Sequence, residues 1–406
     1  MFIDAVELWF YFWNPYQTYT QYGCVVSDFL YFSYMDLDKP EGYSKETAEA
    51  ILQCYDYSGE AEAQKDDTSE GAIVPDDILV IMNESWADLS CAGDFETNIP
   101  YNEFYTNLTE NTIKGTACVS IYGGNTPQSE YEFLTGNTIS FLPSGAIAYN
   151  LYIKKDTPSL VSQLSEQGYE CIAMHPEKAT NFNRNQVYPR LGFSQFLTED
   201  NFTDVVKIRE LCSDQSVYDK MIDLYENKQE GQKLFLYGVT MQNHGGYTYE
   251  GEDFTPLVQT VGLNKTYDKV NQYLTCMRYT DEALENLIGY FSDVDEHVMI
   301  VMFGDHHGDV GSDFYEELYG KKLIDVEGEQ YETRYETPFF IWTNYEIEEK
   351  ADEKISLNYL STLAMQTANI PLTEYQSFWR NFRVIIRLSV WLEFMMQKAI
   401  FIHGIM

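Results

Sequence analysis

Five short apolar runs, separated by segments with helical spacing, constrain the fold of this chain more than any other feature. The length of the runs and their content of β-branched residues are typical of buried strands. The runs cover residues 76–85, 168–175, 233–244, 296–307 and 337–344. The helical segments between them include residues 157–167, 215–227 and 264–291. This alternation predicts an α/β fold with a largely parallel central sheet flanked by helices.

Four of these runs end in residues that bind metals or transfer protons. The ends carry Glu84, His175, His244, and the pair Asp305 and His306. Five of the six histidines lie between positions 175 and 307, a clustering that a plain hydrophobic core does not explain. In open α/β sheets, ligands bind beyond the carboxyl ends of the strands. We therefore expect these side chains to meet at one edge of the sheet.

Asp305 and His306 follow the apolar run VMIVMFG and are candidate metal ligands. Oxygen and imidazole donors suit Mn²⁺, Zn²⁺ or Mg²⁺. The alternative is an Asp-His pair that caps the segment after the strand. Glu84, taken alone, is typical of an acid at the start of a helix. Together with Asp305 and His306 it completes a three-ligand site with a position left for a nucleophile.

The stretch IYGGNTPQSEYEFLTG, residues 121–136, offers that nucleophile. Gly123 and Gly124 permit a sharp turn, and Thr126 followed by Pro127 predicts the start of a helix. The plain interpretation is a threonine that caps the helix. The functional interpretation is a hydroxyl at a helix N-terminus, an environment that suits phosphate chemistry. A metal would lower the pKa of the Thr126 hydroxyl and polarise a phosphoryl oxygen.

Two further loops carry candidate substrate-binding residues. His175 and Arg184 can bracket an anion, because arginine offers forked donors to phosphate oxygens. In so acidic a protein, however, a plain ion pair of Arg184 with an acid is the simpler alternative. His244 precedes two glycines, and a neutral histidine there could protonate a leaving alkoxide.

The charge balance excludes some classes of partner. The chain has 26 basic and 64 acidic residues, a net charge of −38. Such a protein offers no basic field for a nucleic acid and no polybasic patch for anionic lipid headgroups. An anionic substrate therefore needs a local site, which we expect to contain a metal. The seven cysteines are scattered without a CxxC pair and indicate neither a disulfide framework nor a zinc ribbon.

Composition divides the chain into four regions. Residues 1–40 are aromatic and irregular, and we interpret them as a membrane-proximal connector whose transmembrane part is missing. Residues 41–75 form an acidic helical linker, and residues 76–377 form the catalytic domain. Residues 378–406 are a basic tail that differs from the rest of the chain. The tail is either an amphipathic membrane helix or the product of a reading-frame shift, and we favour the shift.

Seven blocks in a fixed order resemble the lipoteichoic acid synthase family, which are phosphoglycerol transferases of the sulfatase/alkaline phosphatase superfamily. The blocks span roughly residues 76–377 and are ILVIMNESWADL, YGGNTPQSEYEFLTG, the His175 block with NFNRNQVYPRLGF, TMQNHGGY, RYTDEALENLI, IVMFGDHHGD and TPFFIWTN. The resemblance implies a sulfatase-like fold and one divalent metal, typically Mn²⁺ with Mg²⁺ or Zn²⁺ as alternatives. The implied metal ligands are Glu84, Thr126, Asp305 and His306.

The resemblance also implies roles for substrate contacts. Thr126 becomes the nucleophile, and His244 or His175 handles the protons. The residues that match the glycerol-phosphate site of the family are His175, Glu177, Phe182, Arg184 and His244. Phe182 occupies a position that can be tryptophan in the family, so the stacking surface can differ.

The activity implied by the resemblance is transfer of glycerol phosphate. A phosphatidylglycerol-type lipid would be the donor, a phospho-threonine the intermediate, and a hydroxyl of a glycerol-phosphate or glycolipid chain the acceptor. The enzyme would face outward from a bacterial cell membrane.

Two alternatives to this activity stay open. A sulfatase-like esterase or phosphodiesterase would use the same site with water as acceptor. A binding protein for anionic polymer would have a dead site. The C/S-x-P-x-R motif of sulfatases is absent around Thr126, which argues against sulfate-ester hydrolysis.

Overall fold

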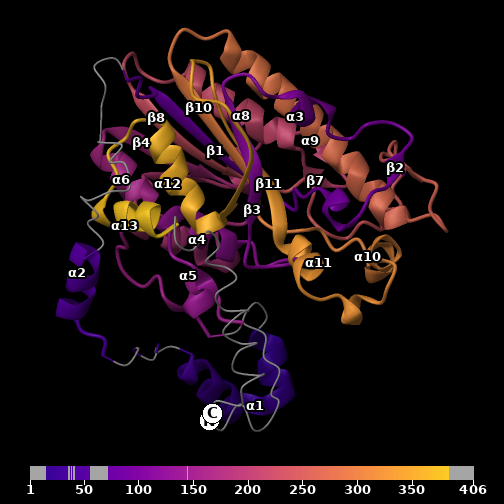
Figure 1. Cartoon of the computed structure of the whole chain (residues 1–406), viewed down its shortest axis with the longest axis horizontal. Coiled ribbons are helices and arrows are strands. Elements are labelled where there is room, and N and C mark those ends of the chain that lie inside the picture. The colour runs from indigo at the N-terminus through magenta and orange to yellow at the C-terminus, as the bar shows by residue number, and fades with distance from the viewer. Residues whose placement is uncertain are drawn as a thin grey trace.

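The computed structural model describes residues 15–34, 37, 39, 42–54, 72–143 and 145–383. Its centre is an eight-stranded sheet with the strand order β12-β3-β11-β10-β1-β8-β4-β5 (Figure 1). In that order the strands are Lys350–Ser356, Thr112–Cys118, Glu336–Thr343, Val298–Gly304, Asp77–Asn83, Lys233–Val239, Tyr169–Met174 and Gln195–Leu197. Two short ribbons lie outside it and pair β2 (Glu96–Thr97) with β9 (Thr260–Val261), and β6 (Lys207–Ile208) with β7 (Leu211–Cys212).

The sheet is largely parallel, as predicted. β1 pairs in parallel with β10 and β8, and β4 pairs in parallel with β8 and β5. β11 is antiparallel to both β10 and β3, and β12 runs parallel to β3. The start of β11 therefore lies at the same edge of the sheet as the ends of the other strands. This geometry brings residues before β11 close to the predicted site.

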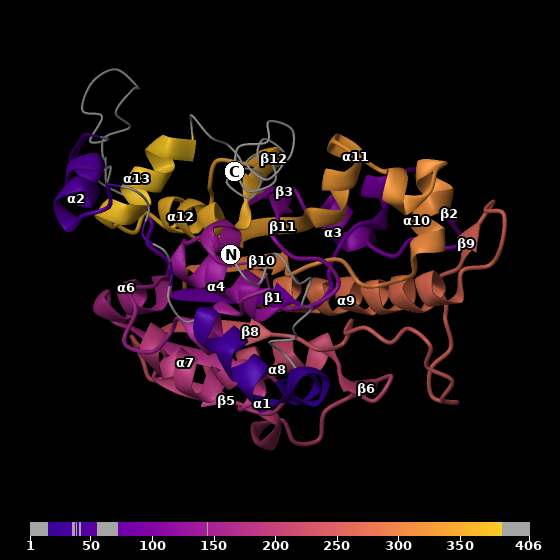
Figure 2. The same ribbon diagram turned by 90° about the horizontal axis from the view of Figure 1, so that it is seen from below.

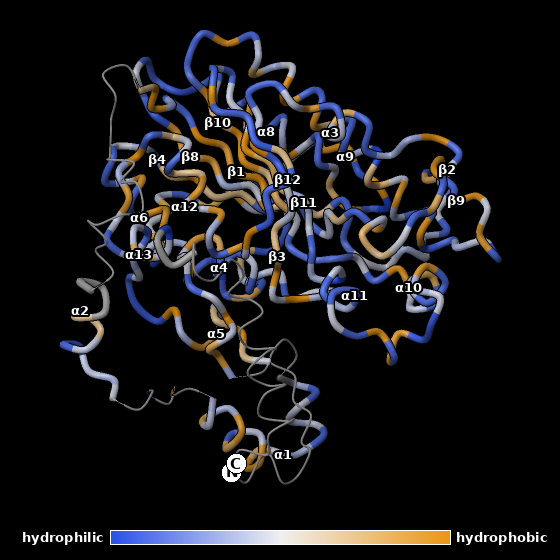
Figure 3. Tube along the Cα trace, viewed as in Figure 1, coloured by the Kyte–Doolittle hydropathy of each residue, from blue (hydrophilic) through white to orange (hydrophobic). Residues whose placement is uncertain are grey.

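Helices cover both faces of the sheet (Figures 1 and 2). Alternate residues of β1 point to opposite faces: Ile78 and Val80 join one hydrophobic core, and Leu79 and Ile81 join the other. Figure 3 shows the apolar strands at the centre. The first core includes residues of α4 (Pro127–Thr135), α5 (Ala148–Leu151), α6 (Leu160–Glu166), α7 (Arg184–Leu191) and α12 (Leu357–Thr367). The second packs α3 (Glu103–Asn107), α8 (Asp214–Glu226), α9 (Asp268–Ser292) and α10 (Ser312–Tyr319).

The five predicted strands and the three predicted helical segments are confirmed, but three strands of the central sheet (β3, β5 and β12) and the four strands of the short ribbons were not predicted. α6, α8 and α9 lie in the three predicted helical segments, and α2 (Lys45–Cys54) lies in the predicted acidic linker. β3 and β12 were not predicted because their sequences, TIKGTAC and KADEKIS, mix polar and small residues. Gly115 in β3 is required by a close approach, since a Cβ there would lie 1.9 Å from the carbonyl oxygen of Glu353.

The regions flanking the catalytic domain are described in part. In the aromatic N-terminal region, for which no helix was predicted, α1 (Pro15–Ser33) is helical with a break at Gly23, where φ is 72°; its interpretation as a membrane-proximal connector stays a prediction. At the other end, α13 (Glu374–Arg383) runs across the predicted domain boundary at residue 377. The interpretations of residues 1–14, 55–71 and 384–406 lie outside the described residues. Of the helices in the described ranges, none combines the length and the apolar character needed to cross a bilayer.

Candidate active site

Glu84, Asp305 and His306 lie together at the carboxyl edge of the sheet. Because β1 and β10 are parallel and Asn83 pairs with Gly304, the residues that follow the two strands are neighbours. One ligand atom from each of the three side chains lies within 4.8 Å of the others. All three residues are buried. The distance from His306 Nε2 is 3.1 Å to Asp305 Oδ2 and 3.7 Å to Glu84 Oε1.

Backbone groups fix the orientation of this triad. Asp305 Oδ1 accepts hydrogen bonds from the amides of Ser85 at 2.7 Å and His306 at 2.9 Å. His306 Nδ1 lies 2.9 Å from the carbonyl oxygen of His307. A carbonyl can only accept, so Nδ1 carries the hydrogen and Nε2 turns its lone pair toward the carboxylates. Gly304 is needed here, since a Cβ would lie 1.8 Å from the carbonyl oxygen of Trp86.

The donor set of the triad fits a divalent cation. Asp305 Oδ2 and His306 Nε2 are buried, and neither has a hydrogen-bond partner although they lie 3.1 Å apart. Within the described ranges, no lysine or arginine forms an ion pair with Glu84 or Asp305. Burial and the Glu84 carboxylate raise the pKa of Asp305 to about 7. The pKa of His306 is raised: burial alone would lower it, but the attraction of the Asp305 and Glu84 carboxylates is larger. Two oxygens and one imidazole nitrogen suit Mn²⁺ or Zn²⁺.

Thr126 stands at the N-terminus of α4, beside the triad. Its hydroxyl makes no capping hydrogen bond, so the interpretation of Thr126 as a plain side-chain cap is wrong. The hydroxyl instead donates to Glu84 Oε2 at 3.4 Å. Ser129, one turn along α4, donates to the carbonyl oxygen of Asp305 at 2.7 Å. This bond ties the first turn of α4 to the end of β10.

The loop before Thr126, residues 121–126, is here called the nucleophile loop. Three successive residues have positive φ: 69° at Gly123, 150° at Gly124 and 67° at Asn125. Such a path strongly favours glycine. A Cβ at either glycine would meet no atom within 4 Å, so backbone conformation and not space requires glycine there.

His175 ends β4 and is buried. Its Nδ1 lies 3.0 Å from the carbonyl oxygen of Val239, so Nδ1 donates and Nε2 is left as an acceptor. Burial and the positive charge of Arg184 lower the pKa of His175 to about 3. At neutral pH His175 is therefore uncharged, and it is suited to accept a hydrogen bond rather than to donate a proton.

The sequence left open that Arg184 forms an ordinary ion pair instead of binding an anion. Arg184 does form an ion pair, but the partner is a buried acid and not one on the surface. Its Nε lies 3.0 Å from Glu130 Oε1. The hydroxyls of Tyr149 and Tyr188 donate to the other oxygen of Glu130, at 3.2 and 2.6 Å. Glu130 belongs to the first turns of α4, so Arg184 is fixed to the helix that carries Thr126. Its contact with an anion stays a prediction.

Phe182 and His244 border this region. The Phe182 ring centroid lies 5.4 Å from the Arg184 guanidinium carbon, and Phe182 has a φ of 53°, a conformation that is uncommon in a bulky residue. His244 is exposed, and its carbonyl oxygen accepts a hydrogen bond from Arg209 at 3.0 Å. Glu177 is half-buried, and its amide donates to the carbonyl oxygen of His175 at 2.7 Å. The substrate contacts of Glu177, Phe182 and His244 also remain predictions.

A buried polar network, which sequence reasoning missed, lies beneath the triad. Asp214 Oδ2 accepts from Asn83 Nδ2 at 2.8 Å and from the Thr280 hydroxyl at 2.7 Å. Asn243 donates to Asn83 and Thr280 in turn. Burial raises the pKa of Asp214. The network joins the residue before Glu84 to the residue before His244. Its only signal in the sequence is that Asn83 and Asn243 stand at the ends of apolar runs.

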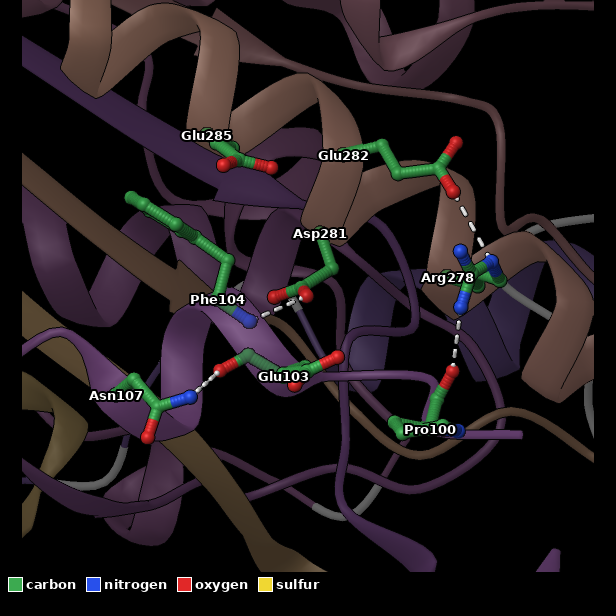
Figure 4. A pocket seen from close by; sticks show the side chains of 8 residues that line it. All are labelled: Pro100, Glu103, Phe104, Asn107, Arg278, Asp281, Glu282 and Glu285. Carbon is green, nitrogen blue, oxygen red and sulfur yellow. Dashed lines mark hydrogen bonds and ion pairs between the residues drawn. The ribbon is translucent and has the colours of Figure 1, made fainter.

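A cavity of about 270 Å³ lies elsewhere, beside α3 and α9 (Figure 4). It is lined by Pro100, Glu103, Phe104, Asn107, Arg278, Asp281, Glu282 and Glu285, none of which is a candidate site residue. Asp281 accepts from the amides of Phe104 and Tyr105, and Arg278 pairs with Glu282 at 3.0 Å. Asp281 thus holds the start of α3 against α9, whereas the pair of Arg278 and Glu282 lies within α9.

Known proteins are similar to this chain over most of its catalytic region. It is 28% identical over 325 residues to a Rhizobium meliloti protein provisionally assigned to cyclic β-1,2-glucan modification, which covers 77% of this chain and 49% of that protein. It is 28% identical over 196 residues to the lipoteichoic acid synthase of Staphylococcus saprophyticus, 46% of this chain and 28% of that protein. The chain thus spans about half or less of the length of these curated relatives.

The fold has a close structural counterpart. The Streptococcus pyogenes phosphoglycerol transferase GacH, solved in complex with sn-glycerol-1-phosphate, superposes with a TM-score of 0.70 at 24% identity. The match covers 85% of this chain and 87% of that one. The sulfatase family model matches residues 76–370, the segment that contains the sheet, the triad and Thr126. This protein therefore belongs to the sulfatase family.

Proposed function

We propose that this protein is a metal-dependent phosphoglycerol transferase with Thr126 as its nucleophile. The observation that carries the proposal is the Thr126 hydroxyl, which turns away from its helix and toward Glu84 at 3.4 Å, beside a buried carboxylate–imidazole triad. Relatives named lipoteichoic acid synthase and a structural neighbour named phosphoglycerol transferase support the same reaction class.

The metal would be held by Glu84, Asp305, His306 and Thr126. A divalent ion there, which we propose to be Mn²⁺, would lower the pKa of the Thr126 hydroxyl and stabilise charge on a phosphoryl group. The protein's contribution is to keep the ligands preorganised. Backbone amides hold Asp305, and the hydrogen bond to the His307 carbonyl sets the tautomer of His306.

In the first step, Thr126 Oγ1 gives up its hydroxyl proton to Glu84 Oε2, toward which it already donates, and forms a bond to the phosphorus of a phosphatidylglycerol-type donor. The bond from phosphorus to the diacylglycerol oxygen breaks, and that oxygen takes a proton. His244 is our candidate proton donor, because it is exposed to solvent, whereas His175 is neutral and its Nε2 is an acceptor. In the second step, an acceptor hydroxyl passes its proton to His244 and attacks phosphorus. The bond from phosphorus to Thr126 Oγ1 breaks, and Oγ1 takes back a proton from Glu84.

The surrounding residues suit a glycerol-phosphate head group. His175 Nε2 would accept a hydrogen bond from a glycerol hydroxyl. Arg184 would place its charge near the phosphate while Glu130 holds it in place, and Phe182 and Glu177 would border the group. The acceptor would be the hydroxyl of a glycerol-phosphate or glycolipid chain, and the enzyme would work at the outer face of a bacterial membrane. Binding of nucleic acid is excluded by the charge of −38.

The test is Thr126→Ala, assayed with Mn²⁺ for release of diacylglycerol from a phosphatidylglycerol analogue. We expect turnover to be abolished while the unfolding temperature is retained. The wild-type protein should carry a phosphoglycerol adduct on Thr126, detectable by mass spectrometry of the peptide. Thr106→Ala, in the surface helix α3, is the matched control and should stay active.

Two outcomes would overturn parts of the proposal. Full activity of Thr126→Ala would remove the mechanism. Free glycerol phosphate as the sole product, with every hydroxyl acceptor tried, would replace transfer by hydrolysis at the same site.

A further inference from the structure

Arg334 lies just before β11, at the edge of the sheet that carries the triad, and it is surrounded by aromatic rings. Its guanidinium carbon lies 4.1 Å from the ring centroid of Tyr122 and 5.8 Å from that of Tyr331. Its Nε is buried without a hydrogen-bond partner. In a chain with 64 acidic residues, Arg334 has no carboxylate partner within the described part. Its contacts point to cation–π interaction and not to ion pairing.

Tyr122, the residue under this guanidinium, belongs to the nucleophile loop. Its ring stacks on that of His307, with centroids 6.2 Å apart and an interplanar angle of 28°. His307 is itself fixed, since Nε2 lies 2.7 Å from the carbonyl oxygen of Glu336 and Nδ1 lies 3.2 Å from the Tyr315 hydroxyl. The group of Arg334, Tyr122 and His307, here called the aromatic stack, therefore connects β11, the nucleophile loop and the triad.

The nucleophile loop has few other side-chain anchors between Tyr122 and Thr126. Gly123 and Gly124 have open space around them, and Asn125 is exposed. Beyond Thr126 the next anchors are Gln128, which hydrogen-bonds to the backbone of Ala146 and Ala148, and Ser129, which donates to the carbonyl oxygen of Asp305. Tyr122 is thus the last side chain that holds the chain before the glycines turn it toward the triad.

We propose that Arg334 is a positioning residue that clamps Tyr122 and thereby holds the Thr126 hydroxyl in its place facing Glu84. This inference rests on the proposed function, in which Thr126 is the nucleophile. Arg334 acts through Tyr122 and touches neither the triad nor Thr126. Displacing a reacting group by about 1 Å costs up to about 100-fold in rate, so a loosened clamp should reduce turnover far more than substrate binding.

The experiment compares Arg334→Ala, Arg334→Lys, Tyr122→Leu and the double variant R334A/Y122L in the donor assay with Mn²⁺. We expect Arg334→Ala to lower kcat about 10- to 100-fold with KM for the donor within about twofold. Arg334→Lys, which keeps the cation, should recover part of that loss. Tyr122→Leu should match Arg334→Ala, and the double variant should lose no more than either, because the two side chains act as one unit.

The control is Arg278→Ala, which removes the same charge from the surface of α9 and should leave kcat and KM unchanged. A raised KM with unchanged kcat in Arg334→Ala would mean that Arg334 contacts an anionic substrate directly. A lower unfolding temperature with unchanged kinetics would mean that it only packs. Each of these results overturns the proposal, as does a double variant whose losses multiply.

Hydrogen exchange gives a readout that does not need activity. The amides of Gln128, Ser129 and Glu130 donate to the carbonyls of Asn125 and Thr126 and report on the turn that carries Thr126. We expect their exchange to be faster in Arg334→Ala than in Arg278→Ala; equal exchange would overturn the proposal. A wild-type protein that does not turn over the donor would contradict the proposed function alone, and exchange would still decide the role of Arg334.

Discussion

Among the described residues, buried carboxylates lie at both ends of β1, but only the one at the amino end is neutralised by a lysine. At the amino end, Asp77 is buried, forms an ion pair with Lys228, and accepts from the amide of Leu234 at 3.0 Å. At the carboxyl end, Glu84 and Asp305 are equally buried, yet in the described ranges no lysine or arginine pairs with them. Burial is therefore not what separates Asp77 from the two carboxylates that we propose as metal ligands.

The difference lies in where the compensating charge comes from. A carboxylate in a low-dielectric interior needs a cation or several donors to stay ionised. Lys228 supplies that charge to Asp77 from within the chain. Among the described residues, His306 is the only side chain able to carry positive charge that pairs with the carboxylates of the triad, and Asp305 Oδ2 is left without a hydrogen-bond donor. The carboxyl end of β1 is thus organised for a cation that comes from solution.

The largest expected effect comes from Asp305→Asn. Mutating a residue that only supports a metal ligand costs up to about 100-fold in metal affinity or activity. Removing a proposed ligand itself should therefore lower turnover by at least about 100-fold. Isothermal titration with Mn²⁺ should show loss of binding. In the presence of a chelator the variant should unfold at a higher temperature than the wild type, because one of two adjacent buried carboxylates has become neutral.

Asp309→Asn is the matched control, since Asp309 is four residues away in the same loop and exposed. It should change neither binding nor unfolding temperature. If Asp305→Asn kept its affinity for Mn²⁺, the carboxylates at the carboxyl end of β1 would not be the site of a cation from solution, and the proposed difference between the two ends would be wrong.

The second effect tests the other end of the strand. Asp77→Asn leaves buried Lys228 with only the longer contact to Glu296, at 3.8 Å, as its carboxylate partner. Breaking a buried pair from one side costs about 3–5 kcal/mol, and we expect a loss toward the lower end of that range. Urea unfolding should show that loss while Mn²⁺ affinity of the folded protein is unchanged. Asp223→Asn is the control, because its pair with Lys220 is on the surface, where such pairs contribute about 0–1 kcal/mol. Equal losses in the two variants would contradict the structural role of Asp77.

Much of the arrangement at the carboxyl edge of the sheet could be predicted from the sequence, because apolar runs show where the buried strands end. Long apolar runs locate β1, β4, β8 and β10, and parallel topology then brings Glu84, His175 and Asp305 to one edge. The convergence of Glu84, Asp305 and His306 follows from the register of only two strands, which is the strongest kind of inference that such a pattern permits.

Contacts between residues distant in sequence could not be predicted in this way. The partner of Arg184 proved to be Glu130, 54 positions away, because α4 and α7 pack on the same face of the sheet. Likewise, nothing near Arg334 in the sequence indicates Tyr122. That contact arises because β11 runs antiparallel, which brings its first residues to the catalytic edge.

The smallest expected effect is on the pH dependence of stability and comes from His175, which lies at the same edge of the sheet as the triad but is uncharged. The unfolded chain binds a proton to this histidine near pH 6.5, whereas the native protein does so only near the lowered pKa of about 3. Between these values the unfolded state binds more protons, so stability falls as the pH is lowered. The slope from one such group is about 1.4 kcal/mol per pH unit.

His175→Gln should remove that slope from urea unfolding measured between pH 6 and about pH 4.5, with a chelator present to keep metal from the triad. His297→Gln, a surface variant with the same number of histidines, should retain it. Identical curves for the two variants would mean that His175 titrates normally and is not the neutral acceptor that its contact with Val239 implies. Lowering the pH would then protonate His175 as well as the triad at the carboxyl edge of the sheet. His175 would replace His244 as the candidate proton donor for the leaving oxygen.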